Sequence, residues 1–154
     1  MIREMVKTEK EVNEVMQIWL ESVVHGHRFI PESYWQNEYK TVEHHYLPMS
    51  KTYVYEENHK IKGFISVINE DFIGALFVGP KYQKQGIGEK LIGFVKEKHV
   101  ALKLAVYCKN AVAIQFYEKH GFKIESTEMN EETGEANYIM GCSVTKEVEL
   151  MHGV

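Results

Sequence analysis

Residues 76–91 constrain the fold more than any other part of the chain, because they join an apolar run to an apolar helical pattern through a loop with two glycines. The apolar run is stopped by Gly79-Pro80, and apolar residues at helical spacing begin at Ile87. The first turn of a helix carries backbone N–H groups without internal partners and a partial positive charge, so glycines there let an anion approach the amides. The segment therefore predicts a site for a phosphate or pyrophosphate group.

Two well-known phosphate-binding loops do not match this segment. A dinucleotide-binding loop needs a third small residue at position 91, where the chain has Leu91, and an ATP-binding loop needs lysine directly after its last glycine, where Gly88 is followed by Glu89. The pattern that remains is Gln83-x-x-Gly86-x-Gly88, placed directly after an apolar strand. On this pattern alone, a strand-to-helix turn that binds nothing is an equal alternative.

Composition and charge describe one globular domain, residues 1–154. Hydrophobic residues at 44% and charged residues at 26% exclude a disordered chain. The net charge of −4, with both signs interspersed, provides no basic stripe for nucleic acid or an anionic membrane. The two cysteines form no Cys-x-x-Cys pair, and no apolar run approaches the roughly 20 residues needed to cross a bilayer. We expect a cytoplasmic protein with reduced thiols.

Apolar periodicity predicts the element order β, α, α, β, β, β, α, β, α, β, β. A helix begins after Thr8 and ends at Gly26, and a second helix is stopped by Pro48. Strand, helix and strand around the glycine loop require a parallel crossover. We therefore expect an α+β fold with a mixed, mostly antiparallel sheet of about seven strands flanked by about four helices. The remaining expected ranges are strands 51–57, 61–69, 72–78, 102–106, 122–129 and 138–144, and helices 86–99 and 110–120.

A second motif gives the first one a context. Residues 110–122 read Asn-x-x-Ala-x-x-Phe-Tyr-x-x-x-Gly-Phe. With this motif, the glycine loop and the element order, the chain resembles the GNAT N-acetyltransferase superfamily from end to end, as a small bacterial single-domain member. The resemblance implies acetyl-CoA as co-substrate and a primary amine of a small molecule, peptide or protein as acceptor. It also implies direct attack by the amine, without a covalent acyl-enzyme.

The resemblance further implies a role for individual residues. The main chain before the loop pairs with the pantetheine arm, and the loop amides hold the pyrophosphate. Asn110 matches an asparagine that hydrogen-bonds the arm, although it is also suited to cap its own helix. Tyr117 matches a tyrosine that gives a proton to the departing thiolate, with core packing as the alternative. The expected coenzyme A contacts are Leu76, Phe77, Val78, Gln83, Lys84, Gln85, Gly86, Ile87, Gly88, Glu89, Asn110 and Tyr117.

The general base is left open, because the strand over residues 72–78 lacks the carboxylate that many family members carry there. Glu70 and His27 are our candidates, and a solvated turn charge and a surface histidine are the alternatives. Asp71, His25 and Glu32 are further choices. The segment after the first helix would overhang the acceptor side in this fold. Its expected acceptor contacts are His25, His27, Phe29, Tyr34 and Trp35, with core packing or a dimer contact as alternatives for the aromatic residues.

No metal is expected, because His25-x-His27 and His44-His45 lack the spacing of a catalytic zinc site. Two other functions stay open. A coenzyme-A-binding regulatory module with little turnover would explain the missing strand carboxylate, and a nucleotide-binding protein would also use a glycine loop. A homodimer is a further expectation, because the closing strand over residues 138–144 is able to pair between two subunits.

Overall fold

The computed structural model describes residues 1–143, which form a seven-stranded sheet in the order β1-β2-β3-β4-β5-β7-β6. Neighbouring strands are antiparallel, except that β4 and β5 run parallel. The expected α+β class and the mostly antiparallel sheet are therefore confirmed. Val144 of the expected closing strand, and residues 144–154 of the expected domain, lie outside the described residues. The strands are β1 (Ile2–Glu4), β2 (Lys51–Glu57), β3 (Lys60–Ile68), β4 (Phe72–Val78), β5 (Ala101–Tyr107), β6 (Lys123–Asn130) and β7 (Glu135–Ser143).

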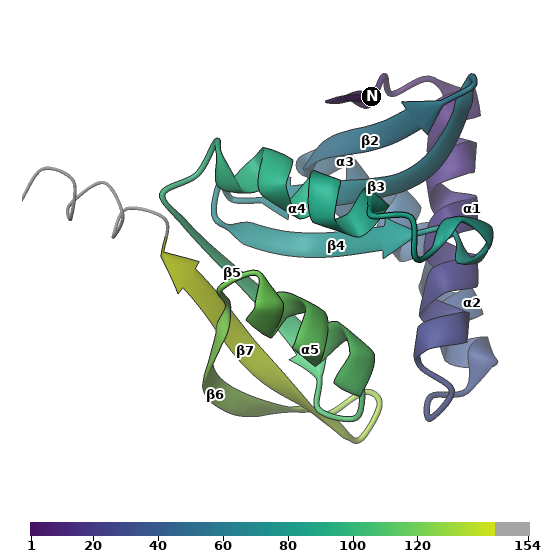
Figure 1. Ribbon diagram of the computed structural model, residues 1–154. Helices are drawn as coiled ribbons and strands as arrows, with labels where there is room; N and C mark the ends of the chain where they lie inside the picture. Colours follow the sequence, from purple (N-terminus) through teal and green to yellow (C-terminus); the bar gives the residue numbers. More distant parts are fainter. Residues whose placement is uncertain (144–154) are drawn as a thin grey trace, which may run out of the picture.

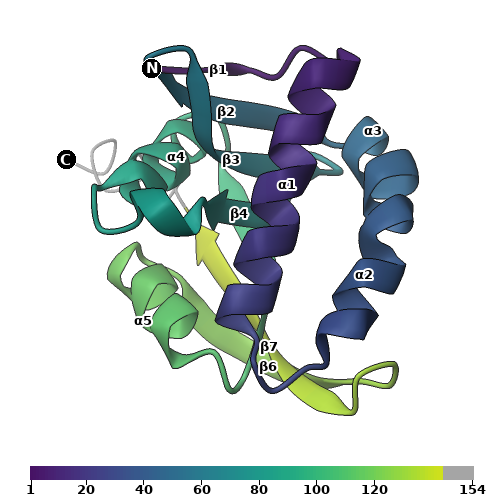
Figure 2. The same ribbon diagram turned by 90° about the vertical axis from the view of Figure 1, so that its right-hand side faces the viewer.

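Helices cover both faces of the sheet (Figures 1 and 2). The helices α4 and α5 lie on one face, and α1 crosses the other face beside α2. Thr8 caps α1 as expected, since its hydroxyl accepts a hydrogen bond from the Glu11 amide at 3.3 Å. The helical elements are α1 (Glu9–Gly26), α2 (Glu32–Thr41), the π turn η1 (Val42–Tyr46), α3 (Leu47–Met49), the 3₁₀ turn η2 (Pro80–Tyr82), α4 (Ile87–Lys96) and α5 (Ala111–Lys119).

The second helix continues past the point where Pro48 was expected to stop it. Proline has no N–H to donate and its ring crowds the carbonyl four residues earlier. The π turn η1 resolves this conflict, because the Leu47 amide bonds to the Val42 carbonyl, five residues back, and Pro48 then occupies the first turn of α3. The chain therefore keeps one bent helix from Glu32 to Met49.

Two hydrophobic clusters fill the two layers. The apolar stripe of α4, including Ile87 and Leu91, packs on one face of the sheet with Ile65 of β3. Met16 of α1 packs on the opposite face with Phe64, the neighbour of Ile65. Successive side chains of β3 thus point to opposite faces of the sheet and contribute to both clusters, as expected for a strand that is covered on both faces. The strand β4 therefore lies between the two layers, with side chains in both clusters.

The parallel pairing of β4 with β5 covers two residue pairs, Phe72 with Lys103 and Ile73 with Leu104. Beyond these pairs the two ribbons diverge toward their carboxyl ends (Figure 1). Gly74 follows at once as a β-bulge, because Ile73 and Ala75 oppose consecutive residues of β3. We call the point where the pairing ends the strand split. Main-chain groups of β4 after the split face β5 without a ladder bond to it.

Candidate active site

The glycine loop places free amides at the start of α4. Gly86 is the N-cap residue with φ of 79°, and the first helical bond runs from the Lys90 amide to the Gly86 carbonyl at 3.1 Å. The amides of Ile87, Gly88 and Glu89 precede that bond, so they have no partner within the helix. A Cβ atom built at Gly86 would meet no atom within 4 Å. The amides therefore border open space, as an anion site requires.

The helix α5 closes the other side of this loop. A Cβ atom at Gly88 would lie 3.4 Å from two ring carbons of Phe116 and 3.8 Å from the Val78 side chain. Lys119 of α5 forms an ion pair with Glu89 at 2.9 Å. The end of β4, the start of α4 and the outer part of α5 thus meet at Gly88. The ion pair with Lys119 partly neutralises the negative charge of the Glu89 carboxylate. An anion is therefore repelled less when it approaches the backbone amide of Glu89.

Tyr117 lies on α5 with its ring packed edge-on against Phe116 and Phe122, at centroid distances of 5.4 and 5.6 Å. The side chain is partly exposed. Burial raises the pKa of Tyr117 above its ordinary value, and no other cause contributes. The phenol is therefore protonated at neutral pH, as an unperturbed tyrosine also is, and the raised pKa makes it a weaker acid toward a thiolate.

Asn110 performs two tasks at the start of α5. Its side-chain oxygen accepts a hydrogen bond from the Ala113 amide at 3.2 Å, which confirms the expected N-cap. Its amide nitrogen lies 3.3 Å from Nε2 of His27, whose Nδ1 lies 2.9 Å from the Val23 carbonyl. A carbonyl only accepts, so Nδ1 carries the proton and Nε2 accepts from Asn110. His27 is therefore the neutral Nδ1–H tautomer, and burial lowers its pKa.

Four of the five residues expected at the acceptor side come together in one aromatic cluster. His27 contacts Trp35 at 5.3 Å and Phe29 at 5.7 Å between ring centroids, and Tyr34 stacks edge-on against Trp35 at 5.0 Å. Tyr107 at the end of β5 completes the cluster, 5.2 Å from His27. The Trp35 indole N–H is buried without an acceptor among residues 1–143. His25 is exposed and takes no part.

Sequence reasoning missed Tyr107 and the contacts of the β6–β7 turn. The Tyr107 hydroxyl accepts a hydrogen bond from the Asn130 side chain at 3.3 Å, and the Tyr34 hydroxyl donates to the Glu132 carboxylate at 2.9 Å. An aromatic residue at the carboxyl end of a strand, just before Asn110, was a local signal for Tyr107. Nothing local marks Asn130 or Glu132, because they reach α2 and β5 only through the closing hairpin.

The candidate bases occupy different surroundings. Glu70 is exposed in a turn with Asn69, both at positive φ, before the amino end of β4. The α4 amides follow the opposite end of this seven-residue strand, which is roughly 20 Å long at about 3.3 Å per residue. Asp71 and Glu32 are also exposed, and β4 itself carries no carboxylate. His27 has both ring nitrogens engaged. Neither Glu70 nor His27 is tested as a base, and each stays a prediction.

Within residues 1–143, no group of three or more His, Cys, Asp or Glu side chains is arranged to hold a metal ion. None of the helices described there is long and apolar enough to cross a membrane.

Comparison with known proteins adds a family to this geometry. Residues 48–124 match the model of the acetyltransferase (GNAT) domain. Peptidyl-lysine N-acetyltransferase YiaC of Escherichia coli (strain K12) is 38% identical over 146 residues, which cover 95% of this chain and 99% of the relative. The chain belongs to the GNAT acetyltransferase family. This GNAT enzyme therefore transfers an acetyl group from acetyl-CoA to an amine, and the nucleotide-binding and non-catalytic hypotheses of its function are set aside.

Other relatives agree with this GNAT assignment. Peptidyl-lysine N-acetyltransferase YjaB of Salmonella typhimurium is 29% identical over 116 residues, covering 75% of this chain and 79% of the relative. The solved structure of apo YjaB from Escherichia coli has a TM-score of 0.78 at 24% identity, covering 92% of this chain and 95% of that one. PaiA N-acetyltransferase from Thermoplasma acidophilum, solved with coenzyme A, has a TM-score of 0.75 at 20% identity, covering 93% and 99%. These two structures share the fold of the GNAT enzyme.

Proposed function

We propose that this enzyme acetylates the ε-amino group of lysine in peptides or proteins, with Tyr117 as the proton donor to coenzyme A. The observation that carries the proposal is the strand split, with free helix amides beyond the end of β4 and a protonated tyrosine on α5. The lysine acceptor is suggested by the names of the relatives YiaC and YjaB. A small-molecule amine is the second candidate.

The donor is assigned to the strand split by its chemistry. The pyrophosphate would bind the amides at Gly86, Ile87 and Gly88, since helix N-termini attract anions. The pantetheine arm would run back along β4 from Val78 toward Gly74 and hydrogen-bond main-chain groups that β5 leaves unpaired. The expected contacts at Leu76, Phe77 and Val78 use backbone atoms, so their side chains remain free to pack in the two layers.

The reaction then runs through one tetrahedral intermediate. The acceptor ammonium loses one proton to water, and the neutral amine attacks the thioester carbonyl. The nitrogen of the tetrahedral intermediate loses a second proton to water, and the C–S bond breaks, which leaves a neutral amide and a coenzyme A thiolate. Tyr117 gives its proton to the thiolate and regains one from solvent. A positioned acid of this kind is worth about 10²–10⁴-fold in rate.

A panel of amines tests the acceptor assignment. Purified enzyme and acetyl-CoA are mixed with a lysine peptide, the same peptide with its lysine blocked, and a set of polyamines and aminoglycosides, and thiol release is followed. We expect the lysine peptide to give the highest kcat/KM, with the acetyl group located on the lysine by mass spectrometry. A small amine that exceeds it by about tenfold would reassign the acceptor.

The Tyr34–Glu132 hydrogen bond is expected to shape the acceptor side. Tyr34→Phe removes a bond to a carboxylate, which is worth up to about 1.5–3 kcal/mol when buried and less in this exposed position. We expect the KM for the acceptor to rise about threefold to tenfold, and the KM for acetyl-CoA to stay constant. Glu132→Gln, alone and combined with Tyr34→Phe, is the control. If the double variant is no worse than each single variant, the two side chains act as a pair.

His27 is expected to hold the Asn110 amide in place, and two near-isosteric variants separate its bonds. His27→Asn keeps a donor where Nδ1 meets the Val23 carbonyl but loses the partner of Asn110, whereas His27→Gln keeps an acceptor near Nε2. We expect His27→Asn to weaken coenzyme A binding about threefold to tenfold, as one lost hydrogen bond implies, and His27→Gln to restore part of it. Calorimetry measures both affinities. Equal losses in the two variants would contradict this role.

Acidification is expected to destabilise the protein through the same residue. Because burial lowers the pKa of His27 below its ordinary value of 6.5, the unfolded chain binds a proton more readily than the folded chain. The free energy of unfolding should therefore fall as the pH drops below about 6.5 and stay unaffected by His27 above it. Urea unfolding at several pH values checks this slope. His27→Gln should show a smaller slope, and not a zero slope, because burial also lowers the pKa of His120.

Cellular location and assembly extend the proposal. Cys108 and Cys142 are free thiols, which supports a reducing cytoplasm. The expected pairing of residues 138–144 between two subunits is wrong, because β7 lies between β5 and β6 and has no free edge. A homodimer would instead use β6, which lies at the edge of the sheet and is exposed over nearly its whole length. Light scattering on the purified protein would give a mass near 18 kDa if the chain is a monomer and twice that for a dimer.

A further inference from the structure

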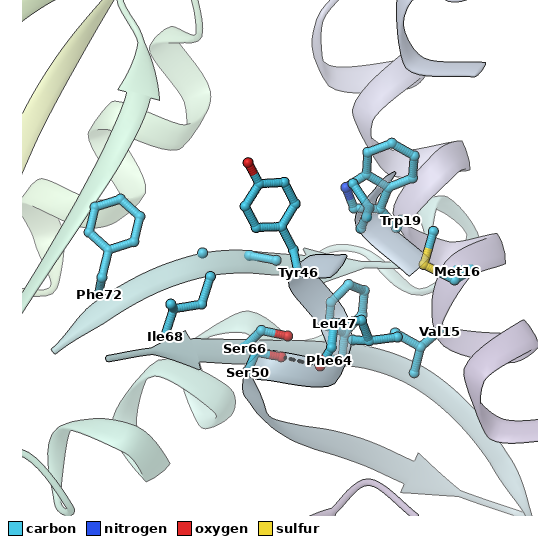
Figure 3. A pocket seen from close by; sticks show the side chains of 13 residues that line it. Val15, Met16, Trp19, Tyr46, Leu47, Ser50, Phe64, Ser66, Ile68 and Phe72 are labelled. Carbon is cyan, nitrogen blue, oxygen red and sulfur yellow. Dashed lines mark hydrogen bonds between the residues drawn. The ribbon is translucent and has the colours of Figure 1, made fainter. Parts of the chain in front are cut away.

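A cavity of about 240 Å³ lies between α1, the π turn η1 and the strands β3 and β4 (Figure 3). It lies on the sheet face opposite α4 and α5, and its lining includes Trp19, Tyr46 and Phe72. None of its lining residues is charged. The proposed reaction assigns nothing to this space.

Two irregularities of the backbone form opposite walls of the cavity. Val42 and Tyr46 come from the π turn, and Gly74 is the β-bulge residue of β4. Both kinds of irregularity are frequent beside functional sites, where they redirect side chains. Gly74 lines the cavity and directly follows the last residue of β4 that pairs with β5, so the cavity borders the strand split. The cavity is thus located at the point where the pantetheine arm, running back along β4, would present its thioester.

Two hydroxyl groups of the cavity lining, those of Ser50 and Ser66, are joined through Thr52. The Ser50 hydroxyl donates to the Leu47 carbonyl at 2.9 Å, so it accepts from Thr52, which in turn accepts from Ser66 at 2.7 Å. These three hydroxyl protons are then used, and the other polar side-chain groups of the lining are the Tyr46 hydroxyl and the Trp19 indole N–H. A stable buried water needs two to four polar partners. An apolar guest therefore displaces few water molecules that are held tightly.

The charge and the position of the cavity indicate which part of the two substrates it receives. The acceptor amine is cationic before it reacts, and the cavity contains no carboxylate to balance it. The acyl chain of the donor is neutral, apolar and attached at the thioester. The volume equals about eight water molecules at about 30 Å³ each, which leaves room for several methylene groups. The acyl chain therefore meets both requirements, and the acceptor amine does not.

We propose that the cavity receives acyl chains longer than acetyl, so that this enzyme also transfers propionyl, butyryl and hexanoyl groups from their coenzyme A thioesters. This inference rests on the proposed placement of the donor along β4. The step is balanced as for acetyl: the C–S bond breaks, the N–C bond forms, the amine proton leaves to water, and the thiolate is protonated. Each buried methylene should increase donor affinity by about fourfold until the cavity is full.

The test uses acetyl-, propionyl-, butyryl- and hexanoyl-CoA. The kcat/KM of each thioester is measured with the same lysine peptide as acceptor, and its affinity is measured by calorimetry without acceptor. Wild-type enzyme should bind butyryl-CoA more tightly than acetyl-CoA and transfer both groups. Val42→Phe adds bulk to the wall opposite β4 and should reduce kcat/KM for butyryl and hexanoyl at least tenfold while acetyl changes by less than about twofold. Val42→Ala should extend activity to longer chains.

The matched control is Val100→Phe, because Val100 is 68% exposed and lies before β5, away from the cavity. It should leave the chain-length profile unchanged. Binding of acetyl-CoA with no binding of the longer thioesters would overturn the inference and leave the proposed function intact. Failure of every thioester to bind would instead overturn the proposed function. A Val42→Phe enzyme with raised acceptor KM and an unchanged chain-length profile would assign the cavity to the acceptor, against the inference.

Discussion

Tyr117→Phe is expected to lower kcat by about 10²–10⁴-fold and to leave the affinity for acetyl-CoA within about twofold. The substitution removes the hydroxyl and keeps the ring, whose edge-on contacts with Phe116 and Phe122 hold α5 in the core. Folding should therefore be preserved. A loss of rate with retained binding is the signature of a group that acts on the departing thiolate and not on ground-state binding.

The measurement pairs steady-state kinetics with calorimetry on the same preparation. Tyr53→Phe is the matched control, because it removes a hydroxyl from a buried tyrosine on β2, away from α5. We expect its kcat to equal that of the wild type.

Burial holds the pKa of Tyr117 above its ordinary value, so the rate of the wild type should show no fall at alkaline pH below about 10 from this residue. If Tyr117→Phe kept full turnover, the proton donor would have to be solvent.

Gly86→Ala is expected to weaken coenzyme A binding about tenfold or more and to destabilise the fold by about 1–2 kcal/mol. The stability cost arises because Gly86 has φ of 79°, a left-handed conformation that disfavours a Cβ atom. The binding cost has a separate cause, since the new methyl would project into the open space beside the α4 amides where the pyrophosphate is assigned. Calorimetry and urea unfolding measure the two effects.

Gly93→Ala provides the opposite result in the same helix. Gly93 lies inside α4 without a positive φ, and a Cβ atom there would meet nothing within 4 Å. Alanine in a helix interior is preferred over glycine by roughly 0.5–1 kcal/mol, so this variant should be more stable than wild type and bind coenzyme A normally. If both glycine variants lost binding equally, the effect would come from α4 as a whole and not from its first turn.

The sequence predicted the local features of the site because they depend on neighbours along the chain. The glycine loop, the start of α4 and the cap at Asn110 each require a few consecutive residues, and the structure has them where expected. The family resemblance implied that the main chain before the glycine loop pairs with the pantetheine arm, but it did not give the residue at which β5 leaves β4. That place depends on the bulge at Gly74, which only the register of β3 against β4 reveals.

Contacts between distant elements were beyond sequence reasoning. His27 was expected at the acceptor side, yet its bond to Asn110 joins the end of α1 to the start of α5, which are 83 residues apart. The bond between Tyr34 and Glu132 spans 98 residues and depends on how the closing hairpin folds back. The π turn was also missed, because the sequence shows Pro48 as an end and not the shift of register that accommodates it. Each case depends on packing that periodicity does not encode.

The strand split also couples the stability of the folded enzyme to the concentration of its acyl donor. Two residue pairs make up the whole ladder pairing of β4 with β5, so few backbone hydrogen bonds join the half of the sheet carrying β5, β6 and β7 to the other half. A thioester lying beside β4 would add hydrogen bonds at the strand split. Because it would bind only the folded chain, it would stabilise the folded state by mass action. The protein would then resist unfolding and proteolysis best when its acyl donor is abundant, and be removed soonest when that donor is scarce.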